Sequence, residues 1–417
     1  MKVAVVGTGI SGLVAARGLH REHDLTVFEA ADWIGGHTNT LELDTPDGPL
    51  AVDSGFIVFN EKTYPNFCAL LRELGVAWKD SDMSFSVRCE GSGLEYNGTD
   101  LNGLFAQRTN VLRPSFWRMV RDILRFYREA PAVLERPDDE TTLGQYLEEN
   151  GYSRLFVEKH LVPMGAAVWS STPETMLRFP LRFLVQFFHN HGFLRVDDRP
   201  QWLVVRGGSR EYVQPLIEPF RDRIRLRTPV VEVRRTSAGV LVRTASGEET
   251  LFDRVVLATH ADQSLRMLSD ATPLEEEILG AFEFQRNDVV VHTDDRLMPR
   301  RRRAWASWNY HVTDPASELP TVTYWMNNLQ GLEVETPYFV TLNRTAEVDE
   351  SKILRELVYH HPIFTRRSVL AQRRHAEIDG VACVHFCGAY WRYGFHEDGV
   401  QSALAMLGNL EREAVPS

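Results

Sequence analysis

The sequence is poor in cysteine, and this shortage restricts the chemistry that the chain can support. Its four cysteines are Cys68, Cys89, Cys383 and Cys387. They form no Cys-x-x-Cys pair, and no Cys/His cluster has the spacing of metal ligands. We therefore expect no metal site, and a chain with so few cysteines fits a reducing cytoplasm best.

Long apolar runs and lysine are also scarce. No apolar run approaches the roughly 20 residues that a membrane-spanning helix needs. Lys2 precedes an apolar stretch as in a signal peptide, but three glycines interrupt that stretch, so we expect no cleavage. Lysine occurs only at positions 2, 62, 79, 159 and 352, and the net charge is −11. This charge opposes nucleic acid binding, and the prediction is a cytoplasmic protein, with peripheral membrane contact left open.

The N-terminal segment carries the most informative pattern. An apolar run, Val3 to Val6, predicts a buried strand, and a Gly-x-Gly-x-x-Gly turn opens a helix that runs to about His20. A second strand, Leu25 to Phe28, ends at Glu29. Helix N-termini favour anionic diphosphates, and an acid at that strand end accepts hydrogen bonds from a ribose 2′-hydroxyl. The order of these elements predicts an adenine dinucleotide site.

The rest of the chain returns to this nucleotide domain twice. We predict one discontinuous domain from residues 1–60, 202–265 and 380–417, whose last part has a strand, Val381 to Phe386, and a helix opened by Gly399. Residues 61–201 and 266–379 are helical and rich in aromatic side chains, and we expect them to build a second domain over the first.

One helix in the second domain is clearly amphipathic. The spacing predicts that Phe116, Trp117, Val120, Ile123, Leu124 and Tyr127 share one face and that Arg118, Arg121, Arg125 and Arg128 share the other. We favour a helix packed on the core with a solvated arginine face; the alternative is a helix lying on an anionic membrane. Arg300 to Arg303 is a second basic run, read as a solvated loop or a contact for an anionic group.

Several scattered motifs, taken together, resemble the amine oxidase and carotenoid desaturase superfamily of FAD enzymes. Besides the N-terminal turn, they are Gly35-Gly36-His37, Asp53-Ser54-Gly55-Phe56, Gly207-Gly208, Thr228-Pro229-Val230, Val256 to Thr259, and Gly388 with Asp398-Gly399-Val400. The resemblance implies an α/β fold with a discontinuous Rossmann-like FAD-binding domain and an α+β substrate domain. The cofactor residues that it and the turn together imply are Gly7, Thr8, Gly9, Ile10, Ser11, Gly12, Glu29, Ala30, Gly35, Gly36, His37, Gly55, Phe56, Ile57, Val230, Ala258, Gly388, Ala389, Asp398, Gly399 and Val400.

Within this superfamily, the sequence is most similar to a bacterial branch of predicted NAD/FAD-binding proteins found beside cyclopropane-fatty-acid-synthase-like methyltransferases. The stretches that carry this likeness are His191-Gly192 to Ser209, Gly165 to Ser170, Ala258 to Asp262 and Gly394 to Gly399. The likeness implies a lipid acyl chain as substrate.

The sequence also departs from the superfamily. The stretch Phe284 to Val289 has no lysine where amine oxidases commonly place one near flavin N5, and His37 stands where an arginine is usual. The nearest match to an aromatic residue over the flavin is His396, with Phe395 beside it. Because histidine titrates near neutral pH, His396 is a candidate catalytic residue, with Glu397 beside it; the alternative is that His396 packs on the cofactor or caps the helix.

We therefore expect an FAD oxidoreductase that moves a hydride from an apolar, lipid-like chain to the flavin, with oxygen, a quinone or a carrier protein as electron acceptor. The candidate substrate residues are Trp308, Tyr310, Tyr324, Trp325, Asn327 and Tyr390. The aromatic band from Phe179 to Phe193 forms either core or an acyl tunnel. The alternatives are an amine or polyamine oxidase and a flavin-binding accessory of a lipid methyltransferase.

Overall fold

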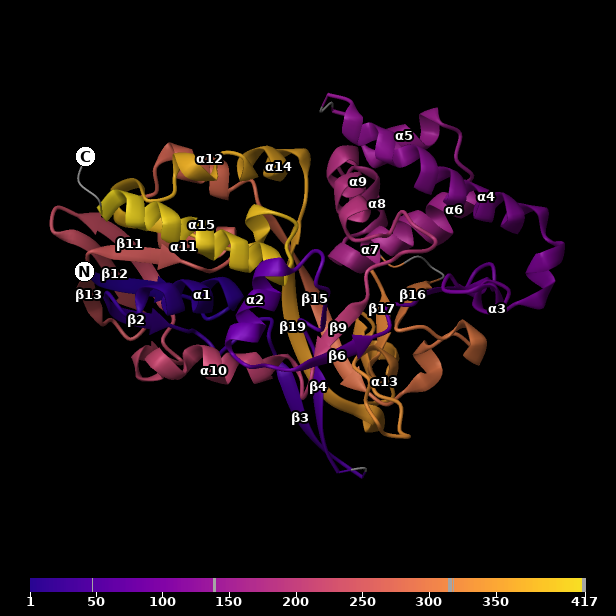
Figure 1. The fold of residues 1–417 in the computed structure, drawn as a ribbon, viewed down its shortest axis with the longest axis horizontal. Helices are drawn as coiled ribbons and strands as arrows, with labels where there is room; N and C mark the ends of the chain where they lie inside the picture. The colour runs from indigo at the N-terminus through magenta and orange to yellow at the C-terminus, as the bar shows by residue number, and fades with distance from the viewer. Residues whose placement is uncertain (47, 138–139, 314–316, 318, 415–417) are drawn as a thin grey trace.

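The computed structural model describes residues 1–46, 48–137, 140–313, 317 and 319–414. The described chain has two halves, each built around its own sheet (Figure 1). The N-terminus and the end of the described chain lie in the same half. This mixed helix and strand architecture confirms the expected α/β class.

A five-stranded parallel sheet forms the centre of the first half. Its order is β10-β2-β1-β14-β20. These strands are β1 (Lys2–Val6), β2 (Asp24–Phe28), β10 (Ile224–Arg225), β14 (Arg254–Leu257) and β20 (Val384–Phe386). They come from three separated parts of the chain. The exact domain boundaries stay a prediction.

Alternating side chains of the central strand β1 pack on opposite layers. Val3 and Val5 face a core that they share with α1 (Ile10–Leu19), α2 (Pro65–Glu73), α10 (Val213–Ile217) and α15 (His396–Ala414). Ala4 and Val6 face a core built with β11 (Val230–Thr236), β12 (Gly239–Thr244), β13 (Glu249–Phe252), α11 (Ala261–Met267) and α12 (Pro273–Leu279), and α14 (Arg366–Gln372) packs against α12. The sheet is therefore covered on both faces, as parallel sheets require.

A seven-stranded mixed sheet forms the second half, in the order β19-β15-β18-β17-β16-β7-β8. Its strands are β7 (Phe85–Cys89), β8 (Glu95–Asn97), β15 (Glu283–His292), β16 (Trp308–Val312), β17 (Val322–Trp325), β18 (Phe339–Leu342) and β19 (Ile353–Ile363). Its helices are α3 (Leu101–Leu104), α4 (Pro114–Glu129), α5 (Leu143–Glu149), α6 (Arg154–Phe156), α7 (Val162–Trp169), α8 (Pro173–Leu177), α9 (Leu181–Asn190) and α13 (Met326–Leu329). Two small sheets, β3 (Thr40–Thr45) with β4 (Gly48–Asp53), and β5 (Val58–Phe59) with β9 (Trp202–Val205) and β6 (Trp78–Ser81), complete the fold.

Two C-terminal elements begin elsewhere than predicted. The strand expected from Val381 starts at Val384, because Ala382 and Cys383 have φ of +49° and +72°, which an extended strand does not allow. The helix expected from Gly399 starts at His396. The two candidate catalytic residues therefore lie in the first turn of α15, and this placement decides what they contact.

The buried face of α4 is rotated relative to the prediction. Its fully buried side chains are Phe116, Met119, Asp122 and Phe126, while Trp117 and Leu124 are about half exposed. Asp122 is buried because its carboxylate accepts a hydrogen bond from the Ser153 backbone N–H, at 2.9 Å. The helix does pack on the core, as we favoured, but the prediction that Trp117 and Leu124 belong to the packed face is wrong.

Among the described residues, no helix combines the length and the apolar character that crossing a membrane requires.

Candidate active site

A cavity of about 790 Å³ is lined by residues from both large sheets. At one end, the loops that follow β1 and β2 meet the Gly35–His37 loop and the segment before α15. At the other end, side chains of α7, α9 and the seven-stranded sheet form the wall. We call the first part the nucleotide end and the second the apolar arm.

The β1–α1 turn forms the floor of the nucleotide end. Gly7 has a φ of +104°, and a Cβ on Gly12 would lie 2.0 Å from the Gly7 carbonyl oxygen, so both positions require glycine. Gly9 differs, because a Cβ there would meet nothing within 4 Å and would stand in the cavity. No described side chain caps α1 at Gly9, so the first N–H groups of the helix remain available for an anion.

Glu29 connects the end of β2 to this turn. Its carboxylate accepts hydrogen bonds from the Thr8 N–H at 2.9 Å, the Thr8 hydroxyl at 2.5 Å and the Ala31 N–H at 2.8 Å. Glu29 is also the only acidic side chain among the described residues that line the cavity. A carboxylate held in this way suits a ribose diol and repels a 2′-phosphate.

His37 lies against the same turn, because a Cβ on its neighbour Gly36 would be 3.1 Å from Gly9 Cα. The ring of His37 packs 4.9 Å from Tyr359 and 5.5 Å from His361, centroid to centroid. Burial lowers the pKa of His37 to about 4, with His360 contributing further, so the ring is neutral. The neutral ring does not supply the fixed charge that an arginine would.

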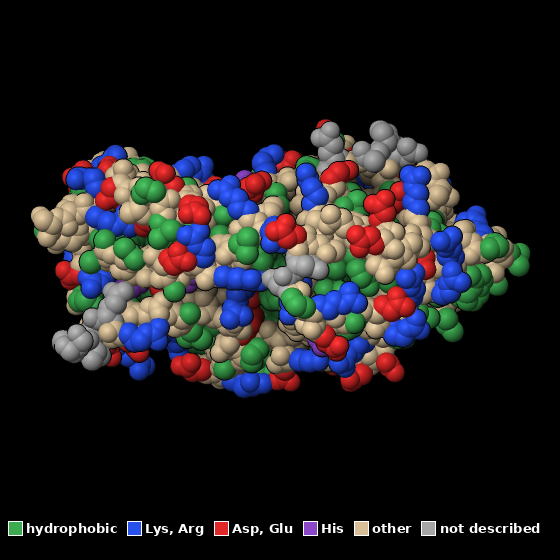
Figure 2. Space-filling view, turned by 90° about the horizontal axis from the view of Figure 1, so that it is seen from above, with side chains coloured by type: hydrophobic (Ala, Val, Ile, Leu, Met, Phe, Trp, Pro, Cys, Tyr) green, Lys and Arg blue, Asp and Glu red, His purple; other side chains and the backbone are tan. Residues whose placement is uncertain are grey.

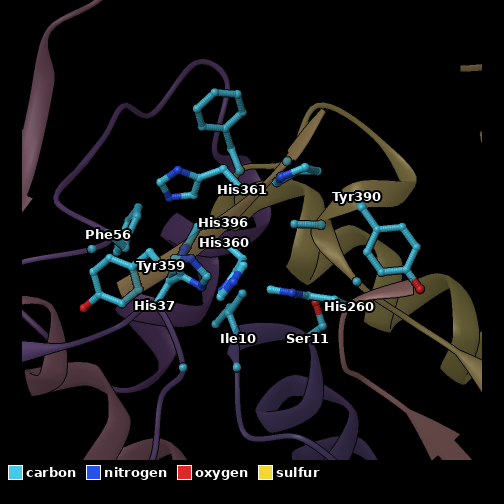
Figure 3. Close-up of a pocket in the computed structure, with 18 of the residues that line it drawn as sticks. Ile10, Ser11, His37, Phe56, His260, Tyr359, His360, His361, Tyr390 and His396 are labelled. Carbon is cyan, nitrogen blue, oxygen red and sulfur yellow. The ribbon is translucent and has the colours of Figure 1, made fainter. Parts of the chain in front are cut away.

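Four histidines meet at this end of the cavity. Figure 3 shows His37, His260, His360 and His361 gathered near the start of α1, marked by Ile10 and Ser11. Burial is the largest cause of a lowered pKa for His260 and His361, to about 3 in each case. Nε2 of His37 has no hydrogen-bond partner among the described residues. An unpaired buried nitrogen beside a cradle of glycines fits a polar ligand.

The predicted cofactor residues mostly come together here. Those that line the cavity are Gly7, Thr8, Gly9, Ile10, Ser11, Glu29, Ala30, Gly35, Gly36, His37, Gly55, Phe56, Ile57, Val230, Ala258, Gly388 and Ala389. Gly12, Asp398, Gly399 and Val400 do not line it. Gly399 instead lets α15 approach α1, since a Cβ there would lie 2.7 Å from Ile10 Cγ2.

His396 lines the cavity but is held by its neighbours. Its Nε2 lies 3.0 Å from the Thr38 hydroxyl and 2.9 Å from the Tyr212 hydroxyl, and its ring stacks on Phe56 at 3.5 Å. Burial lowers the pKa of His396 well below 6.5. The expectation of a histidine that titrates near neutral pH is therefore wrong, and the contacts favour a positioning role for this ring.

Glu397 points away from the cavity. Its carboxylate accepts hydrogen bonds from the Phe67 N–H at 2.9 Å, the Asn66 side-chain amide at 2.6 Å and the Gln401 amide at 2.8 Å. These bonds cap α2 and hold it to α15. We therefore withdraw Glu397 as a catalytic candidate, because no described part of it reaches the cavity.

Asp398 also serves the helix rather than the cavity. One of its carboxylate oxygens accepts a hydrogen bond from the Phe395 N–H at 2.9 Å, and burial raises the pKa of Asp398 to about 7. Phe395 itself lines the cavity and stacks on Phe187 at 5.0 Å. The residue that the start of α15 presents to the apolar arm is therefore Phe395.

Only half of the predicted substrate residues reach the cavity. Trp308, Tyr324 and Tyr390 line the cavity, whereas Tyr310, Trp325 and Asn327 do not. Trp325 follows Tyr324 in β17 and so projects from the opposite face, 5.4 Å from Trp305.

The other two excluded side chains serve the fold. Tyr310 is buried in the core of the second half. The Asn327 amide donates to the backbone carbonyls of Val334 and Thr336. These three positions are corrections to the prediction.

Sequence reasoning missed much of the apolar arm. Its further lining residues are Met83, Val168, Trp169, Val289, Leu342 and Tyr393. The aromatic band that we left open between core and tunnel divides. Phe187 and Phe193 line the cavity, whereas Phe179 and Phe188 are buried in the core. The Gly165–Ser170 stretch, singled out only for its likeness to a family branch, contributes the α7 wall.

The chain matches the model of a known protein family. The model of the family described as "Flavin containing amine oxidoreductase" matches residues 10–286. The human protein "Amine oxidase [flavin-containing] B" is 26% identical over 252 residues, 59% of this chain and 48% of its own length, so the chain spans about half of that relative.

Solved structures share the fold over the whole chain. Cyclohexylamine oxidase from Brevibacterium oxydans has a TM-score of 0.68 at 18% identity, and a CLA-producing fatty acid isomerase from P. acnes has 0.68 at 13%, each covering 99% of both chains. The family is flavin-containing, which confirms the expected cofactor class and the expected class of flavin-dependent oxidoreductase. The chain belongs to the flavin containing amine oxidoreductase family.

Proposed function

We propose that this protein is an FAD-dependent oxidoreductase that dehydrogenates an apolar carbon chain, such as the acyl chain of a lipid: one carbon loses a hydride, the neighbouring carbon loses a proton that passes to solvent, and a double bond forms between them. The observation that carries the proposal is the composition of the apolar arm. It joins the nucleotide end directly and is walled by aromatic and aliphatic side chains, and the described cavity lining has no lysine and no acid except Glu29. An arm of this kind favours a substrate that needs no counter-charge.

Residues of the chain have distinct tasks in this proposal. The α1 N-terminus and Gly9 would hold the FAD diphosphate, and Glu29 would bind its ribose. Bound FAD supplies an acceptor for two electrons and a proton as hydride. Phe395, Phe187 and Trp308 would align the chain and exclude water, which places most of the catalytic contribution in orientation.

An amine oxidase is the second candidate, favoured by the family match and by the name of the human relative. A protonated amine would find no carboxylate in the apolar arm among the described residues, so we rank it below an apolar chain. The resemblance of the sequence to the bacterial branch found beside cyclopropane-fatty-acid-synthase-like methyltransferases supports the lipid proposal. The candidate electron acceptors are oxygen, a quinone and a carrier protein.

Anaerobic photometry of the FAD-loaded protein tests these options. We expect phospholipids or free fatty acids to bleach the visible absorption of the flavin, and amines to leave it unchanged. Bleaching by amines alone would refute the apolar substrate in favour of amine oxidation. A flavin that no compound reduces, but whose protein changes the rate of a lipid methyltransferase, would refute catalysis and indicate an accessory role.

A further inference from the structure

One end of the second half carries large apolar side chains on its surface. The end is formed by α3, the 3-10 helix η1 (Arg108–Leu112) and the start of α4. Leu101 is 75% exposed, Leu112 85% and Trp117 48%. Figure 2 shows hydrophobic and basic side chains gathered at this end, on the right. We call the surface made by residues 101–121 the apolar tip.

The charge of the apolar tip contrasts with the rest of the chain. Residues 101–121 contain four arginines, Arg108, Arg113, Arg118 and Arg121, and no acid, whereas the whole chain has a net charge of −11. All four arginines are exposed. None of them forms an ion pair with another described residue. Four exposed arginines with no acidic partner among the described residues, around exposed leucines, are complementary to an anionic surface.

Neighbouring segments extend this positive surface. The turn η7 (Arg302–Ala304), part of the second basic run, packs beside α3, and Arg303 in it is exposed. Trp117 has its indole N–H bonded to the Val111 carbonyl at 2.8 Å and its ring 5.3 Å from Phe105, so its orientation is fixed. A fixed tryptophan beside leucines and arginines is typical of a membrane interface.

We propose that the apolar tip docks on an anionic lipid bilayer, with Leu101, Leu112 and Trp117 entering the interface and the arginines meeting lipid phosphates. Charge complementarity selects this occupant. A second copy docked tip to tip would set arginines against arginines, and the negative charge elsewhere on the chain would orient the tip toward the bilayer. The proposal is independent of the substrate proposed above.

Vesicle flotation of the FAD-loaded protein tests the proposal. We expect the protein to float with vesicles of phosphatidylglycerol and phosphatidylcholine, to bind pure phosphatidylcholine about tenfold more weakly, and to detach at high salt. The double variant Leu101→Ser/Leu112→Ser should lose about a hundredfold or more in partitioning, because burial of each leucine is worth about tenfold or more. Arg113→Glu/Arg118→Glu should remove the preference for anionic vesicles.

Matched controls lie in the other half of the molecule. Leu370→Ser/Leu404→Ser changes two leucines that are 44% and 46% exposed, and Arg21→Glu changes an exposed arginine; both should bind as the parent does. Absence of binding, or binding that the tip variants leave unchanged, would overturn the proposal. A lipid-free dimer that Leu112→Ser dissociates in sedimentation velocity would also overturn it, by assigning the tip to a second copy.

Discussion

Two glycines in the first turn separate folding from cofactor binding, and replacing each by alanine gives the sharpest test of the nucleotide end. In Gly12→Ala, the new Cβ would lie 2.0 Å from the Gly7 carbonyl oxygen. Backbone cannot yield as a flexible side chain can, so we expect a loss of about 3 kcal/mol or more in the free energy of unfolding. Gly12→Ala should therefore be less stable to unfolding than the parent, both without FAD and with it.

Gly9→Ala should behave in the opposite way. Gly9 has φ −63° and ψ 172°, which any L-residue adopts, and its Cβ would meet nothing within 4 Å. The unfolding free energy of the FAD-free protein should stay equal or rise by about 0.4–1 kcal/mol. The methyl group, however, would occupy the space in front of the uncapped N–H groups of α1. Losing two charge-assisted hydrogen bonds costs about 3 kcal/mol, or about a hundredfold in the Kd for FAD.

Thermal unfolding of the FAD-free variants, followed by fluorescence titration with FAD, measures both quantities. The expected pattern is a stable Gly9→Ala that binds FAD poorly and an unstable Gly12→Ala. If Gly9→Ala bound FAD as tightly as the parent, the diphosphate could not lie at the α1 N-terminus, and our assignment of the nucleotide end would be refuted.

Three further predictions concern buried polar groups and the apolar arm. Glu397→Gln turns an NH₂ group toward backbone donors and should cost about 2 kcal/mol in urea unfolding, while the rate of flavin reduction by the substrate stays unchanged; a lost rate would restore a catalytic role. Val168→Asp places a charge in the apolar arm and should slow flavin reduction by an apolar chain on the order of a hundredfold, whereas Val196→Asp, at a 67% exposed position, should not; equal rates would refute the apolar arm as the substrate site. Burial lowers the pKa of His160 to about 3, so the unfolded chain binds a proton below pH 6.5 that the folded chain does not, and stability is lost as the pH falls. Asp398, whose pKa burial raises to about 7, changes stability in the opposite direction, so the test compares the free energy of unfolding of the parent with that of His160→Phe. This difference in unfolding free energy should change by about 2 kcal/mol between pH 7.5 and 5. A difference that stays constant with pH would contradict the buried neutral histidine.

The nucleotide end was predictable because its signals are local. Strand, glycine turn, helix, second strand and Glu29 lie within the first 29 residues, and the contact that requires glycine at position 12, with the Gly7 carbonyl oxygen, lies inside that unit. The return of the chain at Gly388 is not local, but the resemblance of several motifs to one family supplied it. Prediction of the local fold therefore succeeded where a short segment carries its own geometry.

The apolar arm could not be predicted in the same way, because it is assembled from surfaces that meet only in the fold. Tyr324 and Trp325 are adjacent aromatic residues on one strand, and the sequence does not reveal which of them faces inward. Trp169 and Phe187 approach each other at 4.7 Å from two different helices. An aromatic residue in a core and one lining a cavity look alike in sequence, since both are large and apolar.

The start of α15 shows the harder ambiguity, between a helix cap and a catalytic group. Polar residues at a buried helix N-terminus are needed to satisfy backbone donors, and the same residue types perform acid–base catalysis. What decides the matter is a partner far along the chain: Glu397 meets the Phe67 N–H, 330 residues away, and His396 meets the Tyr212 hydroxyl. Both polar side chains are thereby committed to structure, and the neighbouring Phe395 lines the arm. A site that offers an aromatic wall, and no free acid or base from this helix, is suited to a reaction whose rate depends on where the reacting carbon is held.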